Sequence, residues 1–469
     1  MDRTGGLLRK LFSDSEVGKT ITCARTKTEA IVNNVISPHV MEGLVETLKS
    51  DSVLYFGLST DASNRGAQKI PVTIQYFDYR DGGIKTKILE LDLLPNETAE
   101  TITQYIVNTL RKHGIEQKIV SFTADNANVN FGGINRPTGG QNVFVLLKRE
   151  LQKQIVGVGC PAHILHNCIR HGADKLEIDI ESTVMKIYNY FSVYTVRTEK
   201  LKSFCEAVEI QYQQLLSHSK TRWLSLFPAI ERILKLFPAL KEYFLSVEGT
   251  PTVIKRFFEN PFSEIYLWHI HSLLPLFQSK IQAIGKEDVT IVKINCILNA
   301  TLNAIKSRKD NNFKSLTVIR LLNTLENNGI STDIFKTEIL GLYVDLTAYL
   351  EKWIKNIEDF SSFQWMILQK EMKSFSSSDL ASSVEFLSKL NIIVDDVKLF
   401  DEYEVLKEYC RSSDNTERLV PDPLHHSTLD LVYQSGQYRT TTANPEGIDL
   451  QRPLIVHCFL FNCTKYIYF

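Results

Sequence analysis

The 469-residue sequence has no excess of either charge and no long apolar run. Lysine plus arginine (53) and aspartate plus glutamate (54) nearly cancel, whereas a protein that binds DNA by itself usually carries a clear basic excess. Any basic surface must therefore come from local clustering or from a module that this chain lacks. The closest approach to a membrane span, residues 454–469, is short and is interrupted by polar residues. We therefore expect no membrane partner.

Disulfide chemistry and repeats are also missing. Eight cysteines are scattered along the chain and its first residues show no signal-peptide pattern, which favours free thiols in a reducing compartment. No repeat of fixed period and no low-complexity tract occurs. A hydrophobic content of 43% with 23% charged residues describes a folded protein, and the length predicts two or three domains.

The sequence does contain an ordered succession of strand-like and helix-like segments between residue 50 and about 172. Three strand-like runs come first, and a turn containing Asp81-Gly82, a strong hairpin signal, joins the second to the third. Helices and strands then alternate, with expected strands at 53–59, 70–79, 84–91, 119–124 and 155–158 and helices at 97–112 and 143–151. This order predicts a mixed sheet with helices on its faces. It is the ribonuclease-H-like order, in which the first and fourth strands lie side by side.

The rest of the chain has a different character. From 180 to 407 apolar residues recur every three or four positions, which predicts a long all-α block. We therefore expect an α/β plus all-α protein, a ribonuclease-H-like sheet interrupted or followed by a helical insertion domain. The predicted division is a helical lead-in (1–50), a catalytic-type domain (51–235), an all-helical domain (236–411) and an irregular, disordered tail (412–469).

Two aspartates, Asp61 and Asp125, each follow directly on a strand-like run. Either one alone fits an ordinary turn or helix-capping residue. In neighbouring strands, however, the two carboxylates would lie close enough to share a divalent cation such as Mg²⁺ or Mn²⁺. The pair together therefore predicts a present or ancestral metal site.

A Cys-x-x-His element, Cys160 to His163, follows the fifth expected strand. Zinc is one interpretation, but the spacing matches no known finger and at least two ligands would have to come from elsewhere. The interpretation we prefer places His163 at a helix start beside the acidic pair, where it orients a phosphate or a catalytic water.

A second pair, Arg222 and Trp223, opens an amphipathic helix pattern. One interpretation is a core tryptophan with the arginine stem packed along it. The other is a base-stacking tryptophan beside a phosphate-contacting arginine. An aromatic cluster at residues 188–194 is more typical of a core.

Four motifs occur in a fixed order along the chain. They are LSTDAS (58–63), FTADNA (122–127), CPAH with a following asparagine (160–167) and TRWLS (221–225). With them, over roughly residues 15 to 240, the chain resembles transposases of the hAT superfamily, specifically the transposon-derived proteins of animal genomes with a ribonuclease-H-like catalytic domain.

The resemblance implies roles for these residues. Asp61 and Asp125 would be the first two members of an Asp-Asp-Glu triad (the DDE triad) that holds two Mg²⁺ ions, and His163 would lie beside the scissile phosphate. Arg222 and Trp223 would contact and stack the flipped base at a DNA hairpin. The helical block would match the family's insertion domain, DNA would be the partner, and the location would be nuclear.

The chain also departs from the family pattern. No Glu-Arg-x-Phe-Ser segment supplies the third carboxylate, since neither Glu231-Arg232 nor Glu417-Arg418 continues in register. No Cys/His quartet precedes residue 50 to form a DNA-binding module. We therefore expect a transposase fragment with impaired catalysis and weak DNA binding.

Two other functions remain open. The first is a domesticated, non-catalytic nuclear protein that uses the helical block as a partner surface, with a homo-oligomer or a protein partner. The second is a true nuclease, which would need a substituted carboxylate from Glu371, Glu385 or Glu408; no spacing argument selects one of them.

Overall fold

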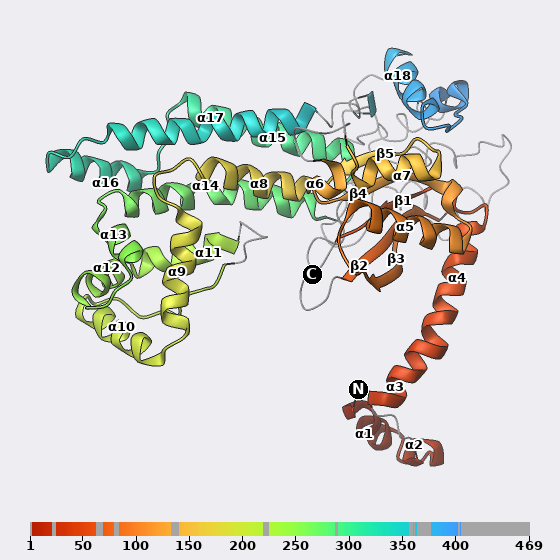
Figure 1. Ribbon diagram of the computed structural model, residues 1–469, viewed down its shortest axis with the longest axis horizontal. Coiled ribbons are helices and arrows are strands. Elements are labelled where there is room, and N and C mark those ends of the chain that lie inside the picture. Colours follow the sequence, from red (N-terminus) through yellow and green to blue (C-terminus); the bar gives the residue numbers. More distant parts are fainter. Residues whose placement is uncertain are drawn as a thin grey trace, which may run out of the picture.

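The computed structural model describes residues 2–20, 25–61, 69–78, 84–132, 140–218, 225–286, 289–355, 360, 362–363, 377–401 and 404. A mixed α/β region comes first and a long helical region follows it (Figure 1). The predicted tail at 412–469 lies outside the described residues. Among the helices that are described, none combines the length and the apolar character needed to cross a membrane.

The sheet has five strands in the order β3-β2-β1-β4-β5. The strands are β1 (Phe56–Ser59), β2 (Lys69–Phe77), β3 (Ile84–Leu93), β4 (Ile119–Ala124) and β5 (Val156–Gly159). Strands β1, β2 and β3 pair antiparallel, whereas β1 with β4 and β4 with β5 pair parallel. The predicted mixed sheet is therefore confirmed, and so is the adjacency of its first and fourth strands.

The first strand is shorter than the predicted 53–59 run. Val53 donates its N–H to the Ser50 carbonyl, 3.3 Å away, so it belongs to a turn. Its own carbonyl accepts from Lys118 Nζ at 2.7 Å. These bonds remove the residue from the ladder although its side chain is apolar and buried.

One face of the sheet is covered by helices α4 (Ser37–Lys49), α5 (Ala99–His113) and α7 (Val143–Leu151). In α5 the apolar residues recur every four positions, as a one-sided helix requires. Its ends are set by Thr98, whose side chain accepts from the Thr101 N–H, and by Gly114, which is left-handed at φ 62°. The core on this face is formed by the following buried residues: Leu48, Phe56, Leu58, Val72, Ile74, Ile102, Ile106, Leu110, Phe122 and Leu147.

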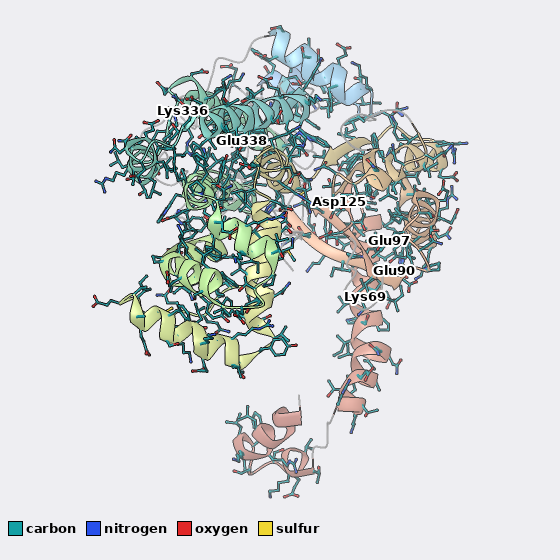
Figure 2. The ribbon with its side chains drawn as sticks, turned by 60° about the vertical axis from the view of Figure 1, so that its left-hand side comes forward. Lys69, Glu90, Glu97, Asp125, Lys336 and Glu338 are labelled. Atoms are coloured by element: carbon teal, nitrogen blue, oxygen red, sulfur yellow. The ribbon has the colours of Figure 1, made fainter. Side chains whose placement is uncertain are left out.

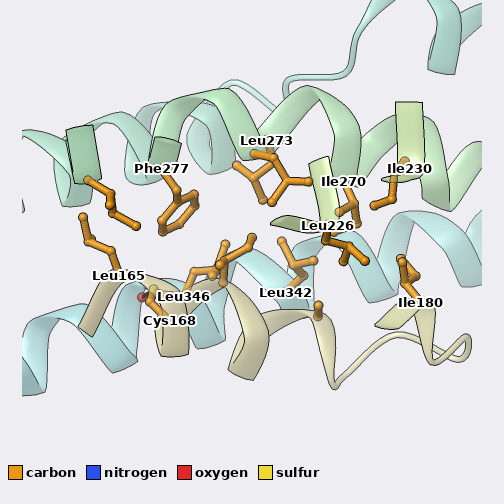
Figure 3. Close-up of a cluster of buried hydrophobic side chains, with 14 of the residues drawn as sticks. Leu165, Cys168, Ile180, Leu226, Ile230, Ile270, Leu273, Phe277, Leu342 and Leu346 are labelled. Carbon is orange, nitrogen blue, oxygen red and sulfur yellow. Dashed lines mark hydrogen bonds between the residues drawn. The ribbon is translucent and has the colours of Figure 1, made fainter. Parts of the chain in front are cut away.

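The other face leads into the helical region. Val120 and Val158 share a second core with α8 (Pro161–Ala173), which lies against α14 (Ser263–Ile284) and α17 (Asp333–Lys355). Figure 3 shows this core between the three helices. The approach of α8 to α17 is close, because a Cβ on Gly172 would lie 2.8 Å from the Leu346 side chain.

The expected all-α block is therefore present over the described part of the chain. Its other helices are α9 (Ile180–Ser192), α10 (Thr195–Ala207), α11 (Leu226–Lys235), α12 (Phe237–Ser246), α13 (Thr252–Glu259), α15 (Ile291–Asp310), α16 (Leu316–Asn327) and α18 (Ser377–Ser388). The buried core continues through α11 and α12 on either side of residue 235. The division into domains at that residue remains a prediction.

The lead-in contains α1 (Asp2–Leu11), α2 (Glu16–Thr20), α3 (Arg25–Ile31) and a π-helical turn (Val32–Ile36) that runs directly into α4. Short helical segments elsewhere are the 3-10 turn Glu116–Lys118 and α6 (Asn128–Phe131). Pro38 occupies the first turn of α4 and has no N–H to donate to the preceding turn. Ser37 instead donates to the Val32 carbonyl, five residues back, so the chain stays helical into α4.

Candidate functional site

Asp61 and Asp125 lie at the same edge of the sheet. Ser59 is the partner of Thr123 in the parallel β1–β4 pair, and the Thr60 N–H extends the ladder to the Thr123 carbonyl at 3.0 Å. Each aspartate follows two residues after that pair, and neighbouring strands are about 4.8 Å apart. The register therefore brings together the two carboxylates that the sequence singled out. Figure 2 shows Asp125 on the side of the sheet that faces the helical region.

Asp125 is held by the turn that follows it. Its Oδ1 accepts from the Ala127 N–H at 3.1 Å and from Asn130 Nδ2 at 2.7 Å. These bonds are the ordinary turn role expected of an aspartate after a strand. They also fix the orientation of the carboxylate, which a ligand to a metal ion requires.

Cys160 joins the end of β5 to the end of β4. Its N–H donates to the Ala124 carbonyl at 2.9 Å, and its own carbonyl accepts from Asn126 Nδ2 at 2.9 Å. Burial, with smaller contributions from the negative charges of Asp61 and Asp125, raises the pKa of the Cys160 thiol to about 12. The thiol thus lies near both carboxylates, in its neutral form.

The zinc interpretation gains no support from this arrangement. The Cys160 thiol is fully buried. Within the described part of the chain, no group of three or more His, Cys, Asp and Glu side chains could hold a metal ion. A cation at this edge would therefore depend on the two carboxylates and on water.

Gly159 is needed where β5 passes Asn126. A Cβ at position 159 would lie 1.8 Å from Asn126 Oδ1, so a side chain would have to displace the amide that binds the Cys160 carbonyl. Asn126 and Gly159 therefore set the spacing between Asp125 and the start of α8. No sequence pattern marks either residue, because their contact joins the end of β5 to the segment after β4.

His163 lies in the first turn of α8 and is half-buried. Its Nδ1 is buried and makes no hydrogen bond within the described structure. The same holds for Thr60 Oγ1, beside Asp61, and for the Oδ1 atoms of Asn126 and Asn130. Buried polar atoms normally have partners. Their concentration at one sheet edge fits a bound, hydrated ligand, and oxygen donors of this kind suit Mg²⁺ or Mn²⁺.

Arg222 and Trp223 lie outside the described residues. The nearest described residues in the chain are His218 and Ser225, whose Nδ1 and Oγ atoms are 2.8 Å apart. His218 Nε2 lies 3.3 Å from Glu181 Oε1. Burial lowers the pKa of His218, and Glu181 opposes this shift. No sequence signal marks this network, because its members come from separate segments.

Of the three glutamates considered as a third carboxylate, the one that the structure describes, Glu385, does not lie at the acidic site. Glu385 is exposed on α18 and pairs with Lys389 at 3.1 Å. Glu371 and Glu408 lie outside the described residues. Glu231, from one of the two Glu-Arg pairs, is engaged at the surface with Lys235 at 2.9 Å.

A search of the sequence against models of known protein families finds no family that matches. The resemblance to hAT transposases therefore depends on the four motifs alone.

Proposed function

We propose that this chain derives from a hAT-type DNA transposase and that Asp61 and Asp125 are the retained half of its acidic site on a ribonuclease-H-like sheet. The observation that carries the proposal is the parallel pairing of β1 with β4, which brings both carboxylates to one edge. The strand order β3-β2-β1-β4-β5 is the order that such a sheet would have, and it supports the same assignment.

Asp61 and Asp125 would hold the divalent cation, Mg²⁺ or Mn²⁺. When bound, such an ion polarises a phosphodiester and lowers the pKa of a coordinated water. Asn130 orients the Asp125 carboxylate through its bond to Oδ1. His163, in the first turn of α8, would contribute a hydrogen bond to a phosphate oxygen or to a water, since its Nδ1 has no partner within the described residues.

The proposed activity is impaired. A second metal ion would need a third carboxylate to hold it, and the described residues supply none. The near-zero net charge argues for weak DNA binding. We therefore infer a nuclear, DNA-associated relic with little or no strand-transfer activity.

The experiment is Mn²⁺ binding by calorimetry together with Mn²⁺-dependent nicking of a DNA hairpin. The variants are Asp61→Ala with Asp125→Ala, and a matched control, Asp310→Ala, whose side chain is 69% exposed. We expect the wild type and the control to bind Mn²⁺, the double variant to lose binding, and nicking to be weak or absent. Strong nicking that the double variant loses would mean that a third carboxylate is present after all.

A second candidate is a non-catalytic interaction protein that uses the helical block. It is favoured by apolar side chains exposed on α16 and α17, among them Leu316 (72%), Ile334 (62%) and Leu340 (53%). Metal dependence separates the two functions. A folded protein that binds no Mn²⁺ and is indifferent to the loss of both aspartates supports the interaction protein.

A further inference from the structure

Strand β3 is the outermost strand on one side of the sheet, and its outer side is long and partly apolar. It has ten residues, whereas β5 on the opposite side of the sheet has four. Among the described segments, only β2 pairs with it. Three of its apolar side chains are 47–56% exposed: Ile88, Leu91 and Leu93. A long outer strand of this kind offers its backbone N–H and C=O groups to another strand.

One extra residue in β3 decides which of its side chains share a face. Glu90 lies opposite Val72, and Ile88 lies opposite Thr73, the next residue of β2. Leu89 therefore has no partner on β2, and its side chain is buried in the core beside the sheet. Such a bulge shifts the alternation of side chains by one position.

Because of the bulge, all four charged residues of β3 lie on one face. Opposite residues of an antiparallel pair have their side chains on the same face. The partners of the charged residues are four alternate residues of β2, all buried in the core on one face: Ile70, Val72, Ile74 and Tyr76. In chain order the charged residues are two lysines followed by two acids, Lys85, Lys87, Glu90 and Asp92. Without the extra residue, the lysines and the acids would lie on opposite faces.

This order of charges makes β3 complementary to itself in one orientation. When two copies of the strand run antiparallel about a two-fold axis at the bulge, Lys85 of each copy lies opposite Asp92 of the other. Lys87 likewise lies opposite Glu90. Both copies carry the same extra residue, so the spacing matches on either side of the axis. A parallel pair in register would instead place lysine opposite lysine. The antiparallel pair thus has the self-complementarity that an isologous interface requires.

The same pairing joins apolar side chains on the other face. Ile84, Thr86, Ile88, Leu91 and Leu93 lie opposite the remaining alternate residues of β2 and so share this face. In the antiparallel pair Ile84 lies opposite Leu93 of the other copy, and Thr86 lies opposite Leu91. Pairing would therefore cover the three exposed apolar side chains.

Glu90 also has a partner within its own chain. Lys112 Nζ on α5 lies 2.9 Å from Glu90 Oε1, and the two side chains are 61% and 27% exposed. A carboxylate has about four lone-pair sites, so Glu90 can accept from Lys87 of another copy as well. His113 Nε2 lies 3.9 Å from Glu90 Oε2, and burial lowers the pKa of His113, so its ring is neutral at pH 7. The contacts of Glu90 are therefore compatible with the pairing.

We propose that β3 pairs antiparallel with β3 of a second copy of this chain, so that two five-stranded sheets form one. Backbone hydrogen bonds hold the strands together, and the charge order fixes their register. Each copy contributes one strand, which makes a small interface, and we expect a weak, salt-sensitive dimer. The interface does not include the acidic site, so the two proposals can fail independently.

The first test is sedimentation of the full chain over a concentration series at low salt. Lys85→Glu with Lys87→Glu makes the strand wholly acidic, and Glu90→Lys with Asp92→Lys makes it wholly basic. Each variant alone should have a dissociation constant raised by at least about tenfold, because all its cross-strand charge pairs become like pairs. An equimolar mixture of the two variants should dimerise, which also shows that both are folded.

The matched control is Lys255→Glu with Arg256→Glu, which makes the same change of charge as the acidic variant at two exposed positions of α13. It should dimerise like the wild type.

The second test fixes the orientation with cysteines. The background is Cys296→Ser, since Cys296 is exposed. Thr86→Cys with Leu91→Cys should give a disulfide-linked dimer on oxidation, because facing residues of an antiparallel pair lie within disulfide reach. Either substitution alone should not, because its two copies would be about 17 Å apart along the strands.

A wild type that stays monomeric would overturn the proposal, whether or not a strand of another protein binds β3. The bulge and the lysines would then protect the outer strand from pairing. A mixture of the acidic and basic variants that does not associate would also overturn it. Crosslinking of a single-cysteine variant as efficient as that of the double variant would exclude the antiparallel register.

Discussion

The sheet edge and the helical core both bury polar atoms that have no hydrogen-bond partner in the described structure, but the groups that surround these atoms differ. At the edge, Thr60 Oγ1, Asn130 Oδ1 and His163 Nδ1 lie with two carboxylates at the ends of parallel strands. In the core, both ring nitrogens of His269 are unpaired, and the ring lies among the aromatic residues Phe335 and Tyr343. Buried polar atoms without partners therefore suggest a ligand site only where several of them lie together beside charged side chains. A single neutral ring in an apolar core is a packing residue.

The largest expected effect is a loss of stability that leaves the acidic site unchanged. Phe277 is fully buried on α14, in the core between α8 and α17 (Figure 3). Phe277→Ala should lower the free energy of unfolding by about 3–5 kcal/mol, since it removes a large side chain and leaves a cavity. Urea unfolding measures this loss. Mn²⁺ affinity of the folded variant should not change.

The matched control is Phe313→Ala, at a ring that is 44% exposed. We expect a loss below about 1 kcal/mol there. If Phe277→Ala were equally mild, the helical core would not be the main source of stability.

The next effect concerns the histidine in the helical core. Burial, with a smaller contribution from Lys314 and Arg308, lowers the pKa of His269 from 6.5 to about 3. The unfolded chain then binds the proton first, so stability is complete above pH 6.5 and falls as the pH drops toward 3. At pH 5 the loss from this residue is about 2 kcal/mol. His269→Leu should remove that part of the acid sensitivity.

Unfolding at pH 7 and pH 5 measures this difference. His218 and His271 also have pKa values lowered by burial, so some acid sensitivity should remain in the variant. His171→Leu, at an exposed position, is the control and should keep the wild-type response. An unchanged response in His269→Leu would mean that this ring is not buried in neutral form.

Local patterns in the sequence predicted the sheet, the position of its two aspartates and the helical region. The hairpin signal at Asp81-Gly82 and the alternation of segments predicted the sheet, because local turn chemistry and apolar period decide both. Once β1 and β4 were expected to be neighbours, the closeness of Asp61 and Asp125 followed from the parallel register. Helical period likewise predicted the all-α block.

Other features depend on contacts between distant segments. The bond from Asn126 to the Cys160 carbonyl and the approach of His218 to Glu181 join segments that no local pattern brings together. Burial along the helix that leads into the sheet region also depends on distant contacts. Apolar spacing at Val40, Leu44 and Leu48 predicts a helix, but spacing alone does not show that Leu44 and Leu48 are buried while Val40 is exposed.

The smallest expected effect tests how the sheet edge is held. Gly159→Ala places a Cβ against the end of the Asn126 side chain, which can rotate away at the loss of its hydrogen bond to the Cys160 carbonyl. We expect a loss of about 1 kcal/mol in unfolding free energy and a several-fold weaker affinity for Mn²⁺. The control is Gly341→Ala on α17, where a Cβ meets nothing within 4 Å and a small gain in stability is expected.

A double-mutant cycle then isolates the contact itself. In an Asn126→Ala background the amide is gone, so Gly159→Ala should add little further loss, and the two changes should be strongly non-additive. Equal losses in both backgrounds would show that Asn126 is not what excludes a side chain from position 159. The unfolding free energies decide this even if the sheet edge binds no metal, because the contact between Asn126 and Gly159 does not depend on a ligand.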